Sequence, residues 1–149
     1  MKYLKISGLL ILVALVGIQF IPTSLNQSEV VPPSDFMISN EVPEHIERKI
    51  RVSCYDCHSN NTEYPWYSTV QPMAWILEDH ITEGKEELNF SEWDDYSSRK
   101  KRSKLRSVKS QIESNKMPLS SYTLLHRDAV ISEKEKKMLL EWLETLEAR

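Results

Sequence analysis

The chain has 149 residues, of which 40% are hydrophobic and 28% charged, and its formal net charge is −3. Three glycines argue against a Gly-rich nucleotide fold, and two cysteines cannot build a disulfide-dense scaffold. Four Trp, six Tyr and three Phe supply core material, which argues against wholesale disorder and indicates one small folded domain.

The first 21 residues resemble an export signal or a membrane anchor. Lys2 and Lys5 precede an apolar run that continues to Ile21, and Pro22 follows it. A positive start followed by an apolar segment is typical of secretory signals. The run is close to the length of about 20 residues that a membrane-crossing helix needs, and no small-residue cleavage site follows it. We therefore expect residues 1–21 to be an uncleaved signal-anchor or, alternatively, a cleaved signal peptide.

Residues 22–42 contain three prolines and several Ser and Asn, and this composition predicts a flexible linker. Residues 43–149 form the predicted domain. Its first helix is expected to start at Pro43 and to carry Ile46 and Ile50 on one face, which continues through the two cysteines.

Three further helices are predicted. Pro72 opens one whose inner face carries Met73, Ile76, Leu77, His80 and Ile81, and Gly84 is expected to end it. Residues 98–114 form a polar helix. Ser132 and Glu135 form the capping box of the last helix. No segment alternates long enough to predict a strand, so the fold class is all-α.

The segment Cys54-Tyr55-Asp56-Cys57-His58 carries the chemistry. C-x-x-C-H is a haem attachment signature, in which each thiol adds across a haem vinyl group and the histidine binds the iron. Covalent attachment of haem occurs outside the cytoplasm, which agrees with the export signal. The sequence thus predicts one covalent haem c on Cys54 and Cys57, with His58 as the proximal iron ligand.

Three other uses of these cysteines compete with haem. A thioredoxin-like dithiol would need a βαβ context, which the pattern lacks. A structural zinc site would need a fourth ligand, for which His80 is a candidate. A simple disulfide would suit an oxidising compartment.

The second axial iron ligand has three candidates. Met117, in Lys116-Met117-Pro118, offers a soft thioether that favours reduced iron, although a methionine often just fills a core gap. His80 would give a bis-histidine site with a lower potential. His126 is the third candidate and would alternatively bond a propionate or a carbonyl. An open position is the remaining alternative, and His45 is expected to be a surface residue.

Two other clusters are notable. Trp66 and Tyr67, in Tyr64-Pro65-Trp66-Tyr67, are expected to wall the haem pocket, unless they only pack in the core. The stretch Arg99–Lys109 holds seven Lys/Arg and no acid. It is either a solvated helix face or a docking patch for an acidic redox partner or anionic lipid. Export and a negatively charged domain argue against a nucleic-acid partner.

Several segments in this order resemble the small bacterial haem-binding domain family, from about Val42 to Leu146. The resemblance implies covalent haem c on Cys54 and Cys57 with His58 as proximal ligand. More loosely, the order of helix, C-x-x-C-H, Met-Pro loop and terminal helix is similar to class I cytochromes c. The matching segments are Ser53–Asn60, Tyr64–Ser68, Pro72–Trp75, His80–Lys85, Leu88–Trp93 and Met117–Tyr122.

The favoured function is one-electron transfer by a single-haem protein on the periplasmic side of the bacterial cytoplasmic membrane, anchored by residues 1–21 or released if the signal is cleaved. A five-coordinate haem sensor or peroxidase-like enzyme is the first alternative. A haem-stabilised interaction module is the second.

Overall fold

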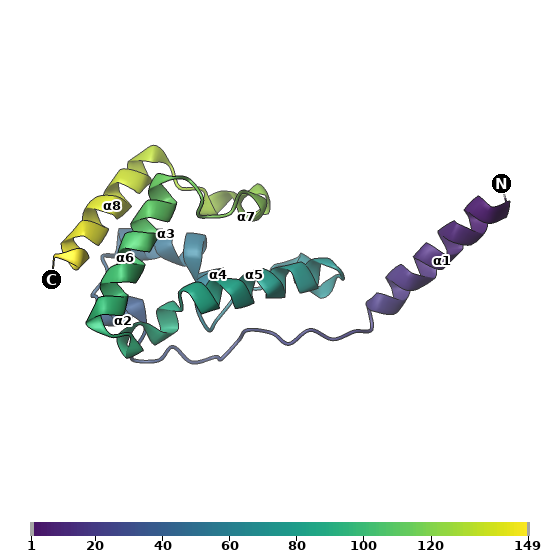
Figure 1. The fold of residues 1–149 in the computed structure, drawn as a ribbon, viewed down its shortest axis with the longest axis horizontal. Coiled ribbons are helices and arrows are strands. Elements are labelled where there is room, and N and C mark those ends of the chain that lie inside the picture. The colour runs from purple at the N-terminus through teal and green to yellow at the C-terminus, as the bar shows by residue number, and fades with distance from the viewer. Residues whose placement is uncertain (1, 149) are drawn as a thin grey trace.

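The computed structural model describes residues 2–148, and the chain folds into helices joined by short loops (Figure 1). Helix α1 (Lys2–Ile18) projects away from the rest, and an extended segment connects it to the packed helices. In the described part of the chain, extended pairing is limited to a single bridge between Gln27 and Asn61. The all-α prediction is confirmed.

Helix α1 is shorter than the predicted apolar run because its last residues leave the helix before Pro22. Gln19, Phe20 and Ile21 instead form tight turns back to Val16, Gly17 and Ile18. Of the helices described, none combines the length and the apolar character that crossing a membrane requires.

The predicted linker 22–42 includes part of the core, which corrects the expectation that all of it is flexible. Asp35 caps the short helix α2 (Phe36–Ser39) by accepting a hydrogen bond from the Met37 amide at 2.9 Å. Phe36 and Met37 are buried. The Phe36 ring lies 4.8–5.9 Å from the rings of Phe90, Trp93 and Trp142. An aromatic side chain with these neighbours cannot belong to a mobile tether.

The core joins the N-terminal and C-terminal helices of the domain. Helix α3 (Glu44–Ile50) begins after Pro43 and buries Ile46 and Ile50, as predicted, and His45 is exposed. Helices α6 (Ser98–Glu113) and α8 (Glu133–Glu147) lie side by side (Figure 1). The predicted capping box of α8 is present. The side chains that α6 and α8 bury are Leu105, Ile112, Leu139, Leu143 and Leu146.

Helix α5 (Met73–Glu87) follows Pro72, but its buried face differs from the predicted one. Leu77 and Ile81 are buried, whereas Met73 and Ile76 are exposed. The helix also continues one turn beyond Gly84, so this glycine does not end it. The remaining short elements are η2 (Trp66–Thr69), η3 (Phe90–Asp95), α7 (Ser120–Leu125) and η4 (Arg127–Ala129).

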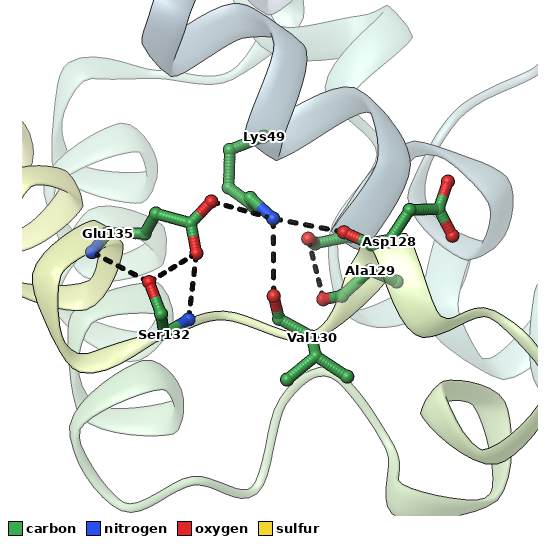
Figure 2. Close-up of polar contacts among 7 residues, drawn as sticks. Lys49, Asp128, Ala129, Val130, Ser132 and Glu135 are labelled. Atoms are coloured by element: carbon green, nitrogen blue, oxygen red, sulfur yellow. Dashed lines mark hydrogen bonds and ion pairs between the residues drawn. The ribbon is translucent and has the colours of Figure 1, made fainter.

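Lys49 ties α3 to the start of α8 (Figure 2). Its ammonium group donates to the carbonyl oxygens of Asp128 and Val130 at 3.0 and 3.2 Å, and lies 2.9 Å from Glu135 Oε1. The side chain is only 13% exposed, and these three acceptors match its three N–H groups. Glu135 also accepts from Ser132, so one carboxylate serves both the cap and the ion pair.

The charge of Glu135 makes a testable contribution to stability at acid pH. Hydrogen bonds from Ser132 and from Lys49 lower the pKa of Glu135 from 4.5 to about 2. A lowered pKa in the folded state means that the carboxylate stabilises the fold above pH 4.5, and that this stabilisation disappears as the pH falls towards 2. We expect Glu135→Gln to show a weaker loss of stability over this range than the unmodified chain, measured by urea unfolding at a series of pH values.

Glu141→Gln is the matched control, because the Glu141 side chain is 66% exposed and pairs with Lys137 only at 3.8 Å. An identical pH dependence for Glu135→Gln and the unmodified chain would contradict the role given to Glu135.

Candidate cofactor site

The C-x-x-C-H segment lies where the first helix of the domain changes its winding. Helix α3 runs into η1 (Arg51–Tyr55), a π-helix, and then into α4 (Asp56–His58). A π-turn is rare and is frequently found at functional sites. Here it buries Ser53 and Tyr55 in the protein, while Cys54 remains half-buried beside a cleft.

Tyr55 fixes this segment to the core. Its hydroxyl donates to the buried carboxylate of Asp35 at 2.9 Å, and its ring stacks on Phe90 with 5.1 Å between centroids. Ser53 donates to the carbonyl of Ala129 at 2.9 Å. These contacts define which side of the segment faces the cleft.

The His58 ring is oriented by two backbone carbonyls. Its Nδ1 lies 2.7 Å from the Gly84 oxygen and 3.0 Å from the Leu88 oxygen. Carbonyl oxygens only accept, so Nδ1 carries the proton and Nε2 keeps a free lone pair. Burial lowers the pKa of His58, which favours the neutral ring. A neutral imidazole held through its other nitrogen is the usual form of a histidine metal ligand.

Gly84 makes this arrangement possible. A Cβ atom at this position would lie 2.5 Å from the carbonyl oxygen of Cys57 and 3.2 Å from its Cβ. Helix α5 therefore approaches α4 closely enough for its backbone to meet the His58 ring. The glycine that the sequence suggested as a helix end is instead a close-packing position in the middle of the site.

A cleft opens on the exposed side of His58. It consists of two adjoining cavities of about 330 and 220 Å³, and the larger of these is within the usual size range of ligand and cofactor sites. Cys54, His58 and Met117 line both cavities. The larger cavity also contacts Cys57, His80, Glu83, Gly84 and Tyr122, and the smaller one Leu88, Phe90, Lys104, Val108, Gln111, Ile112 and Ile131.

The structure separates the three candidates for the second axial ligand. Met117 lines the same two cavities as His58, and the amides of Lys116 and Met117 donate to Gln111 at 3.0 and 3.3 Å. His80 lines only the larger cavity. His126 lines neither, because its Nε2 is 2.8 Å from the Tyr67 hydroxyl and its ring stacks on Tyr122.

The donor set fits a haem better than a zinc ion. Both cysteines are free and half-buried. Zinc binds thiolates in a compact tetrahedral group. Within residues 2–148, no group of three His, Cys, Asp or Glu side chains is placed to hold a metal ion. An imidazole and a thioether in a largely apolar cleft are both axial ligands of haem iron.

Trp66 and Tyr67 do not line the cleft, contrary to the predicted haem wall. Trp66 is 81% exposed, and the Tyr67 hydroxyl bonds His126. The wall residues that the structure supplies instead, Tyr122, Phe90 and Leu88, were missed. Their only signal in the sequence was that all three lie in segments that resemble the family.

Tyr122 connects the Met117 loop to the cysteine segment. Its hydroxyl donates to Asp56 Oδ2 at 2.6 Å, and it lies 3.3 Å from the Val52 carbonyl oxygen. Asp56 stands between the two cysteines and also accepts a hydrogen bond from the Glu63 amide at 3.0 Å. The residue five places after Met117 is thereby anchored to the helix turn that carries Cys57 and His58.

The basic stretch of α6 is largely paired within the chain. Lys101 pairs with Asp94, Lys104 with Glu87, Arg106 with Glu147, and Lys109 with Glu144 and Glu147. Four of the seven cations thus have an acidic partner. Lys100 lies over the Tyr96 ring at 3.9 Å. The cationic character that remains is concentrated at the start of the helix.

The close approach at Gly84 gives a direct test of the site's packing. We expect Gly84→Ala to destabilise the protein, because overpacking costs about 1–3 kcal/mol and outweighs the gain of about 1 kcal/mol in helix propensity. Gly17→Ala is the matched control, since Gly17 is also helical and has no neighbour within 4 Å of the added Cβ. Urea unfolding measures both variants, and equal stability of the two would contradict the packing role.

One comparison with known proteins indicates the same cofactor as the cleft does. A family model described as a haem-binding domain matches residues 13–145. Neither the curated proteins nor the solved structures gave a match to this chain. Because the family model covers most of the sequence and includes the whole cleft, the chain belongs to the haem-binding domain family.

Proposed function

We propose that the protein is an extracytoplasmic c-type haem protein, with one haem attached through Cys54 and Cys57, that carries single electrons. The observation that supports this most strongly is that His58, with its free Nε2, and Met117 line the same cleft. If both residues bound the iron, no position would be open for a substrate, which favours electron transfer over catalysis or gas sensing.

The residues of the chain have distinct roles in this proposal. A bound haem supplies one-electron chemistry at its iron. Gly84 and Leu88 hold the His58 ring through Nδ1, which increases the basicity of Nε2. The Met117 sulfur is a soft and neutral donor that favours the reduced state. Apolar side chains from α6 and η3 line the smaller cavity and would reduce the contact of a bound haem with water, which also affects the potential.

Covalent attachment is tested by removing the thiols. We expect Cys54→Ser/Cys57→Ser to yield protein that loses its colour on acid denaturation, whereas the unmodified chain keeps haem and the corresponding added mass. The measurement is mass spectrometry of denatured protein after expression in a host that matures c-type haem. A control is Ser53→Ala, which alters the neighbouring residue but leaves both sulfurs. If the denatured, unmodified chain has the mass of the polypeptide alone, covalent attachment is contradicted.

Ligation by Met117 is tested with carbon monoxide. We expect the reduced protein to be unchanged by the gas and Met117→Ala to give a rapid spectral shift, because this variant opens one axial position. Met73→Ala is the control, since Met73 is exposed and lies outside both cavities. His80→Ala distinguishes the alternative ligand: a shift in this variant but not in Met117→Ala would assign the position to His80. A shift in the unmodified chain would instead favour a sensor or a peroxidase-like enzyme.

We also propose that the domain lies on the periplasmic side of the cytoplasmic membrane, attached through residues 1–21. The support is the order of Lys2 and Lys5, then a run without charge, then Pro22. The redox partner is unidentified. An acidic partner would find its cationic contacts at Arg99 and Arg102, near the start of α6, rather than along the whole basic stretch.

A further inference from the structure

Trp66 belongs to an exposed apolar surface that the cleft does not explain. Val70, Met73 and Ile76 are exposed by 41–46% and follow it along η2 and the start of α5. The chain turns directly from one element into the other, since the Ala74 amide donates to the Val70 carbonyl at 3.0 Å. We call these four side chains the apolar patch.

The apolar patch lies in a part of the chain that has no charge. Residues 64–77 contain no Asp, Glu, Lys or Arg, although 28% of the whole sequence is charged. Glu63 and Glu78 border this stretch. Exposed large apolar side chains that gather within one uncharged stretch of chain are typical of an interaction site.

Helix α1 ends beside this patch. Gln19 Nε2 donates to the Gln71 carbonyl at 3.0 Å, and the Gln71 amide donates to Gln19 Oε1 at 3.0 Å. Gln71 Nε2 also lies 3.3 Å from the Ile21 carbonyl oxygen. Since Gln71 stands between Val70 and Met73, these bonds hold the C-terminal end of α1 against the middle of the patch. Figure 1 shows this end of α1 near the N-terminal end of α5.

The end of α1 continues the apolar surface. Phe20 is 80% exposed and Ile21 is also exposed. Residues 6–28 carry no charge, so two uncharged stretches that are about 50 positions apart in sequence meet at Gln19 and Gln71. Any apolar surroundings that cover the end of α1 would therefore also reach the apolar patch.

We propose that the apolar patch docks on the lipid bilayer, with Trp66 in the interfacial layer beside the end of α1. This rests on the membrane attachment proposed above. We choose lipid as the binding partner because the patch continues directly into helix α1, which is apolar and whose side chains are almost all exposed. Tryptophan is enriched at the level of the lipid headgroups, where its ring is apolar and its N–H remains hydrated.

Docking through the patch orients the cleft. Helix α5 starts at the patch, first lines the cleft at His80 and packs against the His58 turn at Gly84, which at 1.5 Å per residue lies about 16 Å beyond Met73 along the helix axis. Docking would therefore hold the His58 turn in a fixed position relative to the bilayer surface.

The test uses the full chain in phospholipid vesicles that contain a phospholipid with a diazirine in its acyl chain. After illumination, peptide mass spectrometry locates the cross-links. We expect cross-links in residues 64–76 as well as in α1, and a several-fold loss of those in 64–76 for Trp66→Ser/Met73→Ser. Ile38→Ser is the matched control, because Ile38 is an exposed apolar residue on α2, outside the patch, and its change should leave the labelling as it is.

Each result decides the proposal. Cross-links in α1 with none in residues 64–76 overturn patch docking and leave membrane attachment in place. An absence of cross-links in both segments overturns docking and attachment together. Labelling of the patch that persists unchanged in Trp66→Ser/Met73→Ser also overturns the proposal, as do protein–protein cross-links from patch to patch, which would show a second copy of the chain there. The haem absorbance of the same samples reports separately on cofactor binding.

Discussion

The contact between α4 and α5 at Gly84 determines the rest of the site. Without a Cβ atom at this position, the two helices approach until the Gly84 and Leu88 carbonyl oxygens reach the His58 ring. A hydrogen-bonded Nδ1 fixes both the tautomer and the orientation of the imidazole, so Nε2 faces away from α5. A single missing methyl group thus connects helix packing to the chemistry of the candidate iron ligand.

Two sets of contacts hold the two sides of the cleft together. On one side, Lys49 connects α3 to the segment before α8, and the buried Tyr55 reaches the core at Asp35. On the other side, Tyr122 ties the helix that follows Met117 to Asp56. The candidate iron ligands His58 and Met117 come from distant parts of the sequence, and the Tyr122–Asp56 bond links the two segments that carry them.

The local patterns of the sequence predicted much of this molecule. The capping box at Ser132, the helix over 98–114 and the C-x-x-C-H helix each depend on residues close together in the chain, and each is present. The close packing of Gly84 was not predictable, because it depends on which helix lies opposite, and the π-turn at Arg51–Tyr55 has no signal in the local sequence pattern. Trp66 was misplaced for a related reason. An aromatic residue near a haem motif suggests a pocket wall, but only the tertiary fold decides on which side of the chain the ring lies.

The burial of Phe36 sets a lower limit on how far the domain can be shortened. Besides the aromatic contacts of Phe36, the Asp94 amide donates to the Ser34 carbonyl at 3.0 Å, and the Ser34 hydroxyl donates to Ser91 at 2.7 Å. A version beginning at Pro43 would keep the whole cofactor motif, yet it would leave a hole against Trp93 and remove the acceptor of Tyr55. The smallest unit that retains this architecture therefore begins upstream of Ser34, within the stretch whose prolines make it resemble a spacer.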